Sequence, residues 1–288
     1  ITRPLAQYAL GVLMVMQRSS GGNTAYFLGE VSAGGWWYYF PIVFFLKEPL
    51  ASLALITLAL LIAIWNILKN SNFKKFNDYL GTHFAEFSMI IFIVFYCAYG
   101  MKSPLNIGVR HILPTLPFIY ILAASAIKKL PGRTIIVSAL AIWYFAETLI
   151  AAPYFISYFN RFGGGTEKGY EKVVDSNYDW GQDLKRLAEW AKNPPAGGNI
   201  DKIAVNYFGG GNPEYYLGNK AQNWNSSDGN PVKEGIQWFA ISIGNLQSSI
   251  AQTAEGFERK PEDEYSWLKR PYEPYAKAGT SIFIYKLY

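Results

Sequence analysis

The residues best suited to chemistry in this chain are a few cations that flank long apolar stretches. Arg110 and His111 stand at the start of one such stretch, and Lys47 stands just before another. An ionisable group at membrane depth is costly and often marks the path of a polar substrate. The planar guanidinium of an arginine binds two phosphate oxygens at once. These residues therefore predict a phosphate site, against the alternative that their long side chains only extend to the membrane surface.

A second group of polar residues follows the last apolar stretch. Asp175, Asn177 and Asp179 alternate as at the start of a calcium-binding loop. Trp180 then stands where such a loop requires glycine, and Arg186 stands where it requires a bidentate glutamate. Turn and helix-cap chemistry is therefore the first interpretation, with Asp179 capping the helix that follows. Binding of an acceptor by these side chains is the second.

Other motifs exclude several kinds of site. The glycine triplets Gly163–Gly165 and Gly209–Gly211 lack both the dinucleotide fingerprint and the Lys-Ser/Thr ending of a phosphate loop. The second triplet fits a tight turn better than an anion-binding nest. The two histidines are far apart, and the single cysteine, Cys97, lies in an apolar stretch. The sequence therefore predicts no His/Cys metal site, no internal disulfide and no firmly implied cofactor.

Four apolar stretches must position these residues. Each has close to the ~20 residues that a helix needs to cross a bilayer. We expect transmembrane helices at about 49–68, 84–100, 107–127 and 134–153. Residues 1–48 precede them as an outer loop, with a short amphipathic helix at 1–16 and an aromatic interfacial segment at 34–41.

The segment 160–288 is polar and rich in turns, and it predicts a small α/β domain outside the membrane. We expect a helix with the apolar face Leu184, Leu187, Ala188 and Ala191. Strands are expected at 200–208, 235–243 and 281–287, a helix at 245–257, and a loop at 222–233. The predicted core consists of Ile203, Val205, Phe239, Ile241, Ile243, Ile282 and Ile284. The fold class is thus an α-helical membrane bundle over 49–159 followed by an α/β domain.

Charge is divided unequally and predicts the orientation. Residues 1–159 hold 11 Lys and Arg against 5 Asp and Glu, whereas residues 160–288 hold 15 against 16. The second part lacks the basic excess that nucleic-acid binding requires. Cations gather between spans one and two (Lys69, Lys74, Lys75) and between spans three and four (Lys128, Lys129, Arg133). The positive-inside rule places both loops in the cytoplasm of a multi-pass inner-membrane protein, with residues 160–288 outside.

Several segments, taken in order, carry a resemblance to a known family. They are Leu28–Glu30, Gly35–Pro41 with Lys47–Pro49, Asn106–Pro114 and Asp175–Leu184. Together they resemble the bacterial relatives of the protein O-mannosyltransferases, polytopic GT-C glycosyltransferases that use lipid-phosphate sugars. The resemblance extends from about Arg3 to Tyr285. His111 departs from it, because an aromatic residue commonly follows the arginine in such enzymes.

The resemblance implies a sugar transferase that acts on the outer face of the membrane. Its donor would be a polyprenyl-phosphate sugar, and its acceptor a glycan, lipid or protein. The family's catalytic acids lie in the first outer loop, so we expect none in this chain, which we interpret as the C-terminal part of a longer protein. The donor phosphate would contact Arg110, Lys47 and His111. The alternative is a non-enzymatic, membrane-anchored module that binds a glycan or protein, and a transporter is disfavoured because the spans show no repeat.

Overall fold

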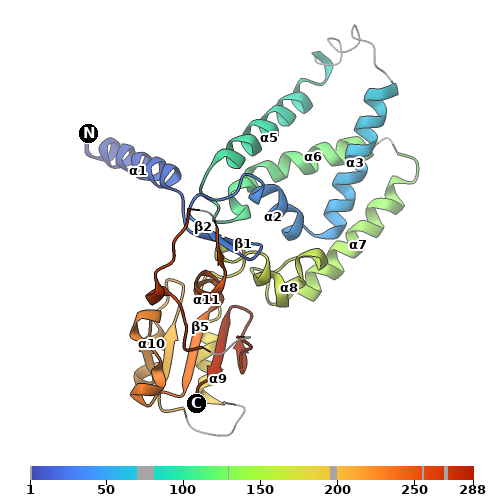
Figure 1. Cartoon of the computed structure of the whole chain (residues 1–288). Coiled ribbons are helices and arrows are strands. Elements are labelled where there is room, and N and C mark those ends of the chain that lie inside the picture. Colours follow the sequence, from blue (N-terminus) through green and yellow to red (C-terminus); the bar gives the residue numbers. More distant parts are fainter. Residues whose placement is uncertain (1, 70–80, 129, 195–199, 255, 269–271) are drawn as a thin grey trace. The chain divides into compact units, whose positions relative to one another are not determined.

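The computed structural model describes residues 2–69, 81–128, 130–194, 200–254, 256–268 and 272–288 (Figure 1). The chain divides into two compact units. Unit 1 contains Ile1–Gly21, Trp36–Ala152 and Phe159–Phe162, and unit 2 contains Gly22–Gly35, Pro153–Tyr158 and Gly163–Tyr288. The expected division at 48 and 159 differs from this one, because residues 22–35 form strands of unit 2.

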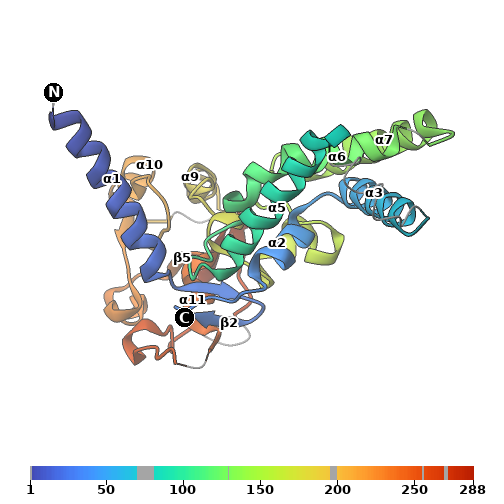
Figure 2. The ribbon, with the colours of Figure 1, turned by 90° about the horizontal axis from the view of Figure 1, so that it is seen from above.

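Unit 1 is helical (Figures 1 and 2). Its elements, with η denoting a 3₁₀ helix, are α1 (Thr2–Gly21), α2 (Tyr39–Lys47), α3 (Leu50–Lys69), α5 (Phe84–Lys102), η1 (Val109–Thr115), α6 (Leu116–Ile127) and α7 (Arg133–Ala151). Among the described residues, four helical segments are long and apolar enough to cross a membrane. They are Leu50–Lys69, Phe84–Lys102, Val109–Ile127 and Arg133–Ala151, which confirms the four predicted stretches within about two residues at each end.

The four segments pack in the order α5, α6, α3, α7, since α6 contacts both α5 and α3, and α3 contacts α7. Few of their residues are buried within the chain, and α5 has none that are buried. Helices that are apolar on all sides in this way suit an apolar surrounding such as lipid.

The third apolar segment begins as a 3₁₀ helix, which the hydrophobic pattern did not predict. Pro114 lies inside η1, and Pro117 lies in the first turn of α6. A proline has no N–H, so Pro114 cannot donate to the carbonyl of Arg110, nor Pro117 to that of Leu113. The start of this segment is therefore wound differently from the α-helix that follows.

Helix α1 is longer than the 16 residues expected. It ends at Gly21, and the next residue, Gly22, has a φ of +72°. The helix continues past residue 16 because residues 17–20 include no proline or glycine that would end it. Its apolar side chains, such as Leu5 and Tyr8, are exposed within this chain.

Unit 2 is built on a mixed five-stranded sheet. The strands lie in the order β4 (Ala221–Asn223), β3 (Ile203–Asn206), β5 (Trp238–Ser242), β8 (Ile282–Lys286) and β7 (Ala276–Ala278). β3 pairs in parallel with β4 and β5, whereas β8 pairs antiparallel with β5 and β7. Parallel neighbours joined through helices confirm the predicted α/β class.

Further elements complete unit 2. A second sheet joins β1 (Ala25–Phe27), β2 (Glu30–Ser32) and β6 (Gln252–Thr253). The helices are α8 (Gly165–Lys168), α9 (Leu184–Lys192), α10 (Pro213–Leu217) and α11 (Ile243–Ile250). The 3₁₀ helices are η3 (Gly169–Glu171), η4 (Asp175–Asn177), η5 (Gly218–Lys220), η6 (Ser226–Asp228), η7 (Pro231–Glu234) and η8 (Pro261–Asp263), and η2 (Arg161–Gly163) precedes them at the junction of the two units.

All seven residues predicted for the core are buried, but they line two faces of the sheet. Val205 is paired with Ala240, and Ala240 with Ile284, so these three share the face that packs on α9. Phe239 alternates with them and packs on the other face against Tyr265. Within one strand the members are two residues apart, as Ile203 and Val205 are, and point to one face as expected.

Two local predictions were also wrong in their bounds. The helix expected at 245–257 is α11, which begins two residues earlier and ends at Ile250. The loop expected at 222–233 contains the end of β4 and two 3₁₀ helices, η6 and η7. Lys74, Lys75 and Lys129, which were expected in the cytoplasmic loops, lie outside the described residues.

Candidate functional site

Lys47 is the last residue of α2, immediately before the first apolar helix of unit 1. Its Nζ atom lies 4.7 Å from the centre of the Phe159 ring. A cation over an aromatic face is attracted by the ring's negative surface. The surrounding burial disfavours the charged form and lowers the pKa of Lys47 to about 7. Near neutral pH, the protonation of Lys47 is therefore sensitive to any charged group that binds beside it.

Asn160 fixes the end of α2 that carries Lys47. Its backbone N–H donates to the carbonyl of Leu46 at 2.9 Å. Its side-chain Nδ2 donates to the carbonyls of Phe45 and Glu48, at 2.6 and 2.9 Å. The last carbonyls of a helix lack partners within the helix. One asparagine therefore satisfies three of them and holds the Lys47–Glu48 junction in place.

Glu48 follows Lys47 and is buried between the end of α2 and the start of α3. The hydroxyl of Tyr120, in α6, donates to Glu48 Oε1 and lies 3.3 Å from the hydroxyl oxygen of Ser52. Burial raises the pKa of Glu48, and its hydrogen bonds to Tyr120 and Ser52 oppose that rise. These contacts join the first turn of α3 to Tyr120 of α6, eleven residues after the start of the segment Val109–Ile127.

Arg110 and His111 lie in η1, at the start of the third apolar segment. Arg110 is exposed, and the ring of His111 packs edge-on against Phe40 of α2, with 6.3 Å between ring centres. Phe40 precedes Lys47 by seven residues, which corresponds to about 10 Å along a helix that rises about 1.5 Å per residue. Of the three predicted phosphate ligands, Arg110 and His111 thus adjoin the first turn of α2, and Lys47 ends that helix. We call residues 39–48 and 106–115 the α2–η1 region.

Asn106 secures the loop that leads into η1. It is fully buried, and its Oδ1 accepts a hydrogen bond of 2.6 Å from the backbone N–H of Trp36. Its Nδ2 donates to the carbonyl of Ser103 at 3.3 Å. These bonds tie the aromatic segment before α2 to the loop before Arg110. They also give the Asn106–Pro114 segment a structural role that its sequence does not reveal.

In unit 2, the run from Asp175 to Leu184 is placed differently from expectation. Asp179 does not cap a helix, because α9 begins at Leu184 and Asp183 occupies the N-cap position. Asp179 is instead fully buried, and its Oδ1 accepts from the backbone N–H of Gly181 at 2.8 Å. Burial raises the pKa of Asp179 to about 6, against the effect of that N–H and of the Ser281 and Ser242 hydroxyls.

The other two residues of this set also make local contacts. Asp175 has a φ of +58°, and its carboxylate accepts from the backbone N–H of Ser176 at 2.5 Å. Asn177 is buried, and its amide donates to the carbonyl of Val174 at 3.4 Å. The predicted ligand set therefore has turn-forming contacts, with the side chains of Asn177 and Asp179 withdrawn from solvent. Within the described part of the chain, no three His, Cys, Asp or Glu side chains gather closely enough to hold a metal ion.

Asp183 is a structural residue that sequence reasoning missed. Its Oδ2 accepts from the backbone N–H groups of Thr280 and Ser281, each at 2.9 Å, and its Oδ1 pairs with Arg186 Nη1 at 2.5 Å. A Cβ at Gly279 would lie 2.2 Å from the carboxylate. The carboxylate therefore fills the turn between β7 and β8. The spacing of Asp183 and Arg186, three residues apart in a helix, was the available signal.

The second glycine triplet packs against this run. A Cβ at Gly209 would lie 2.8 Å from the Cα of Gly181, so the two backbones approach closely. The hydroxyl of Tyr207 donates to the carbonyl of Gly181 at 2.8 Å. The triplet therefore allows close backbone packing, since a side chain at Gly209 would meet Gly181.

The α2–η1 region is thus the candidate functional site, with the exposed cation Arg110, the partly buried cation Lys47, the histidine His111 and the buried carboxyl of Glu48. Comparison of the chain with protein-family models, with characterised proteins and with solved structures found no match.

Proposed function

We propose that the chain is the C-terminal part of an integral-membrane glycosyltransferase of the GT-C type. It would move a sugar from a polyprenyl-phosphate donor to an acceptor on the outer face of the membrane. The observation that supports the proposal is that η1, which carries Arg110 and His111, packs on α2, the helix that ends in Lys47, next to four apolar helical segments. A polyprenyl-phosphate has its apolar chain in lipid and its anion at the membrane surface. The apolar helices suit the chain, and the cations suit the anion.

The reaction gives the cations a defined role. The bond between the sugar's anomeric carbon and the donor phosphate oxygen breaks, and that carbon forms a bond to the acceptor oxygen. Negative charge grows on the departing polyprenyl phosphate, and fixed cations stabilise it. The acceptor hydroxyl loses its proton to a carboxylate. The resemblance places that carboxylate in the first outer loop of such enzymes, so this proposal assigns no catalytic base to the chain.

Arg110 and Lys47 suit different parts of this task. Arg110 is exposed, and its guanidinium can bind two phosphate oxygens in one plane. Lys47 has a pKa of about 7 because it is partly buried, and a phosphate placed nearby would raise that pKa and restore the full positive charge. The donor would therefore create part of its own binding charge when it arrives.

The proposal includes an orientation. The connections between α3 and α5 and between α6 and α7, together with the helix ends that flank them, carry six of the eight Lys and Arg residues between 49 and 153. Both connections would therefore face the cytoplasm of a bacterial cell. The α2–η1 region and unit 2 would then both face the outside of the inner membrane. Membrane lipid and a lipid-linked sugar are the implied partners, with a glycan, lipid or protein as acceptor.

The test is sugar transfer by the full protein in native membranes, from a radiolabelled polyprenyl-phosphate sugar to endogenous acceptors. Arg110→Ala should reduce the initial rate at least tenfold, and Arg110→Lys should recover only part, because a charged hydrogen bond contributes roughly 1.5–3 kcal/mol. Lys102, exposed at the end of α5, provides a matched control. Lys102→Ala removes a cation near the same end of the bundle and should leave the rate within twofold.

Two results would contradict the proposal. Absence of transfer from every polyprenyl-phosphate sugar tried, with normal protein levels, would favour the non-enzymatic binding module. Equal rates for wild type, Arg110→Ala and Lys102→Ala would reduce Arg110 to an anchor at the membrane surface.

A further inference from the structure

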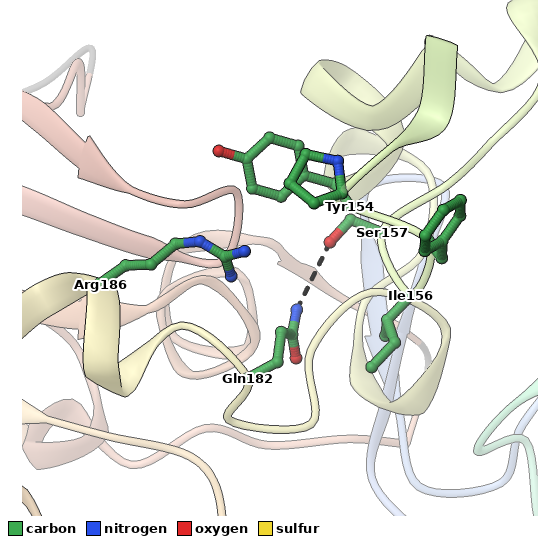
Figure 3. A pocket seen from close by; sticks show the side chains of 7 residues that line it. Tyr154, Ile156, Ser157, Gln182 and Arg186 are labelled. Atoms are coloured by element: carbon green, nitrogen blue, oxygen red, sulfur yellow. Dashed lines mark hydrogen bonds between the residues drawn. The ribbon is translucent and has the colours of Figure 1, made fainter. Parts of the chain in front are cut away.

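Unit 2 contains a pocket of about 280 Å³ between residues 153–157 and the start of α9 (Figure 3). Its walls include Tyr154, Ile156 and Ser157 from the first segment, and Gln182 and Arg186 from the second. Ligand pockets typically measure roughly 300–1,000 Å³. The volume therefore suits one small ring rather than an extended chain.

One wall of the pocket is flat and amphipathic. The guanidinium carbon of Arg186 lies 5.0 Å from the centre of the Tyr154 ring, so a cation and an aromatic ring stand together. Figure 3 shows the Arg186 guanidinium pointing from α9 toward Gln182 and Ser157. An aromatic ring offers apolar contact, and a guanidinium offers several N–H donors in a fixed plane.

The floor of the pocket is held rigid by hydrogen bonds. Gln182 Nε2 donates to the carbonyl of Tyr178 at 3.0 Å and lies 3.4 Å from the hydroxyl of Ser157, while Gln182 Oε1 accepts from the N–H of Trp180 at 2.7 Å. Ser157 is itself buried and pairs with the hydroxyl of Thr280 at 2.5 Å. These groups are fixed before any ligand arrives, which lowers the entropy that binding costs.

The charge of the pocket is compensated. Of the described residues that line it, Arg186 alone is charged at neutral pH, and it pairs with the buried carboxylate of Asp183 at 2.5 Å. An anion in the pocket would compete with that carboxylate and lie near its negative charge. A neutral polar ligand meets the donors of Arg186 without this repulsion.

We infer that this pocket binds a single neutral sugar ring. The C–H face of a pyranose would lie on the Tyr154 ring, and its hydroxyls would accept hydrogen bonds from the Arg186 guanidinium. A sugar ring joins an apolar face to a polar rim, as the Tyr154–Arg186 wall does. The inference goes beyond the proposed transfer reaction, since it assigns unit 2 a binding site of its own that needs no lipid phosphate.

The test uses the full chain in detergent micelles and saturation-transfer NMR with methyl pyranosides of the common neutral hexoses, without donor lipid. At least one pyranoside should receive saturation from the wild type. Tyr154→Ala and Arg186→Met should each weaken its binding about tenfold or more, whereas Tyr154→Phe, which keeps the ring, should stay within threefold. Tyr215→Ala is the matched control, because Tyr215 is a highly exposed tyrosine of α10 outside the pocket.

Three outcomes would overturn the inference. One is no saturation transfer from the wild type to any pyranoside. Another is equal binding by wild type, Tyr154→Ala and Arg186→Met. The third is competitive displacement of the sugar by inorganic phosphate at equal concentration, which would make the pocket an anion site. The Tyr154→Phe and Arg186→Met variants keep the test decisive if Tyr154→Ala does not fold. Sugar transfer is not measured, so failure here leaves the lipid-phosphate proposal standing.

Discussion

The ammonium of Lys47 lies 4.7 Å from the centre of the Phe159 ring, although the two residues are separated by the entire set of apolar helices in the sequence. The neighbouring Asn160 binds three carbonyls around the end of α2. The return of the chain after α7 thus builds one side of the candidate site. Residues 159–162 accordingly belong to unit 1, although the segments on either side of them belong to unit 2.

The lowered pKa of Lys47 predicts how stability changes with pH. The folded chain has a pKa of about 7 at this residue, against 10.5 ordinarily. Between these values the unfolded chain holds the proton and the folded chain does not, so unfolding takes up a proton and stability rises with pH. The melting temperature of the wild type in detergent should therefore rise between pH 7 and 10 relative to that of Lys47→Met. Parallel profiles for the two proteins would show that Lys47 is not buried as described, and Lys102→Met should behave like the wild type.

The raised pKa of Asp179 predicts the opposite slope at acid pH. Its pKa is about 6 in the folded chain and 3.8 ordinarily. Between these values the folded chain binds the extra proton, so stability falls as the pH rises from about 4 to 6 and stays low above it. Asp179→Asn keeps an oxygen for the Gly181 N–H and cannot ionise. Relative to wild type it should gain on the order of 2 kcal/mol between pH 4 and pH 7, given about 1.4 kcal/mol for each pKa unit.

Denaturant titrations of both proteins at the two pH values would measure this gain. A variant that is equally destabilised at both values would mean that the carboxylate is needed in its charged form.

The packing of Gly279 on Asp183 predicts a large cost for adding one methyl group. A Cβ at Gly279 would meet the buried carboxylate at 2.2 Å, and the residue has a φ of +62°. Gly235 has a φ of +77° but nothing within 4 Å of its Cβ position. Gly235→Ala should therefore lower the free energy of unfolding by roughly 1–2 kcal/mol, because a residue with a Cβ is strained in the left-handed backbone conformation. Gly279→Ala should cost at least 2 kcal/mol more, because it also displaces Asp183 from two backbone N–H groups. Equal melting temperatures for the two variants would contradict the described turn.

The proposed orientation predicts where unit 2 can be labelled. Ser227 is exposed in η6, whereas its neighbour Ser226 is only partly so. In a Cys97→Ala background, Ser227→Cys should react with a membrane-impermeant maleimide added to intact spheroplasts. A cysteine introduced at Arg133, at the start of α7, should react only after the membrane is permeabilised. The reverse pattern would invert the topology and remove the α2–η1 region from the outer face.

The sequence predicted those features that depend on local pattern. A run of about 20 apolar residues can satisfy its own backbone hydrogen bonds in lipid only as a helix. The bounds of the four helical segments were therefore predicted to within about two residues. The buried face of α9 followed from helical spacing, and Leu184, Leu187, Ala188 and Ala191 all lie in the core. Lys47, Arg110 and His111 were predicted as ligands from residue type and depth, and their role as ligands stays a prediction.

Contacts between residues that are far apart in the sequence could not be predicted from local pattern. The partners of Lys47 and Glu48 come from Phe159, Asn160 and Tyr120, which no periodicity relates to α2. Asp179 was expected at a helix start because its side chain favours caps, but the chain turns at Gly181 first and buries it. Asp183 accepts a hydrogen bond from the backbone N–H of Thr280, which is 97 residues away in the sequence. Such pairings are set by tertiary structure, and residue type alone does not reveal them.

The most direct measurement compares two lipids that differ only in the phosphate. Polyprenyl phosphate and the polyprenol of the same chain length are titrated into the full protein in detergent, and binding is followed by native mass spectrometry. Wild type should bind the phosphate at least tenfold more tightly than the alcohol at pH 6.5, where Lys47 is charged, and this preference should shrink at pH 8.5. The double variant Lys47→Ala, Arg110→Ala should bind the two lipids equally, whereas Lys102→Ala should retain the preference. Equal binding of phosphate and alcohol by the wild type would contradict a lipid-phosphate site in the α2–η1 region.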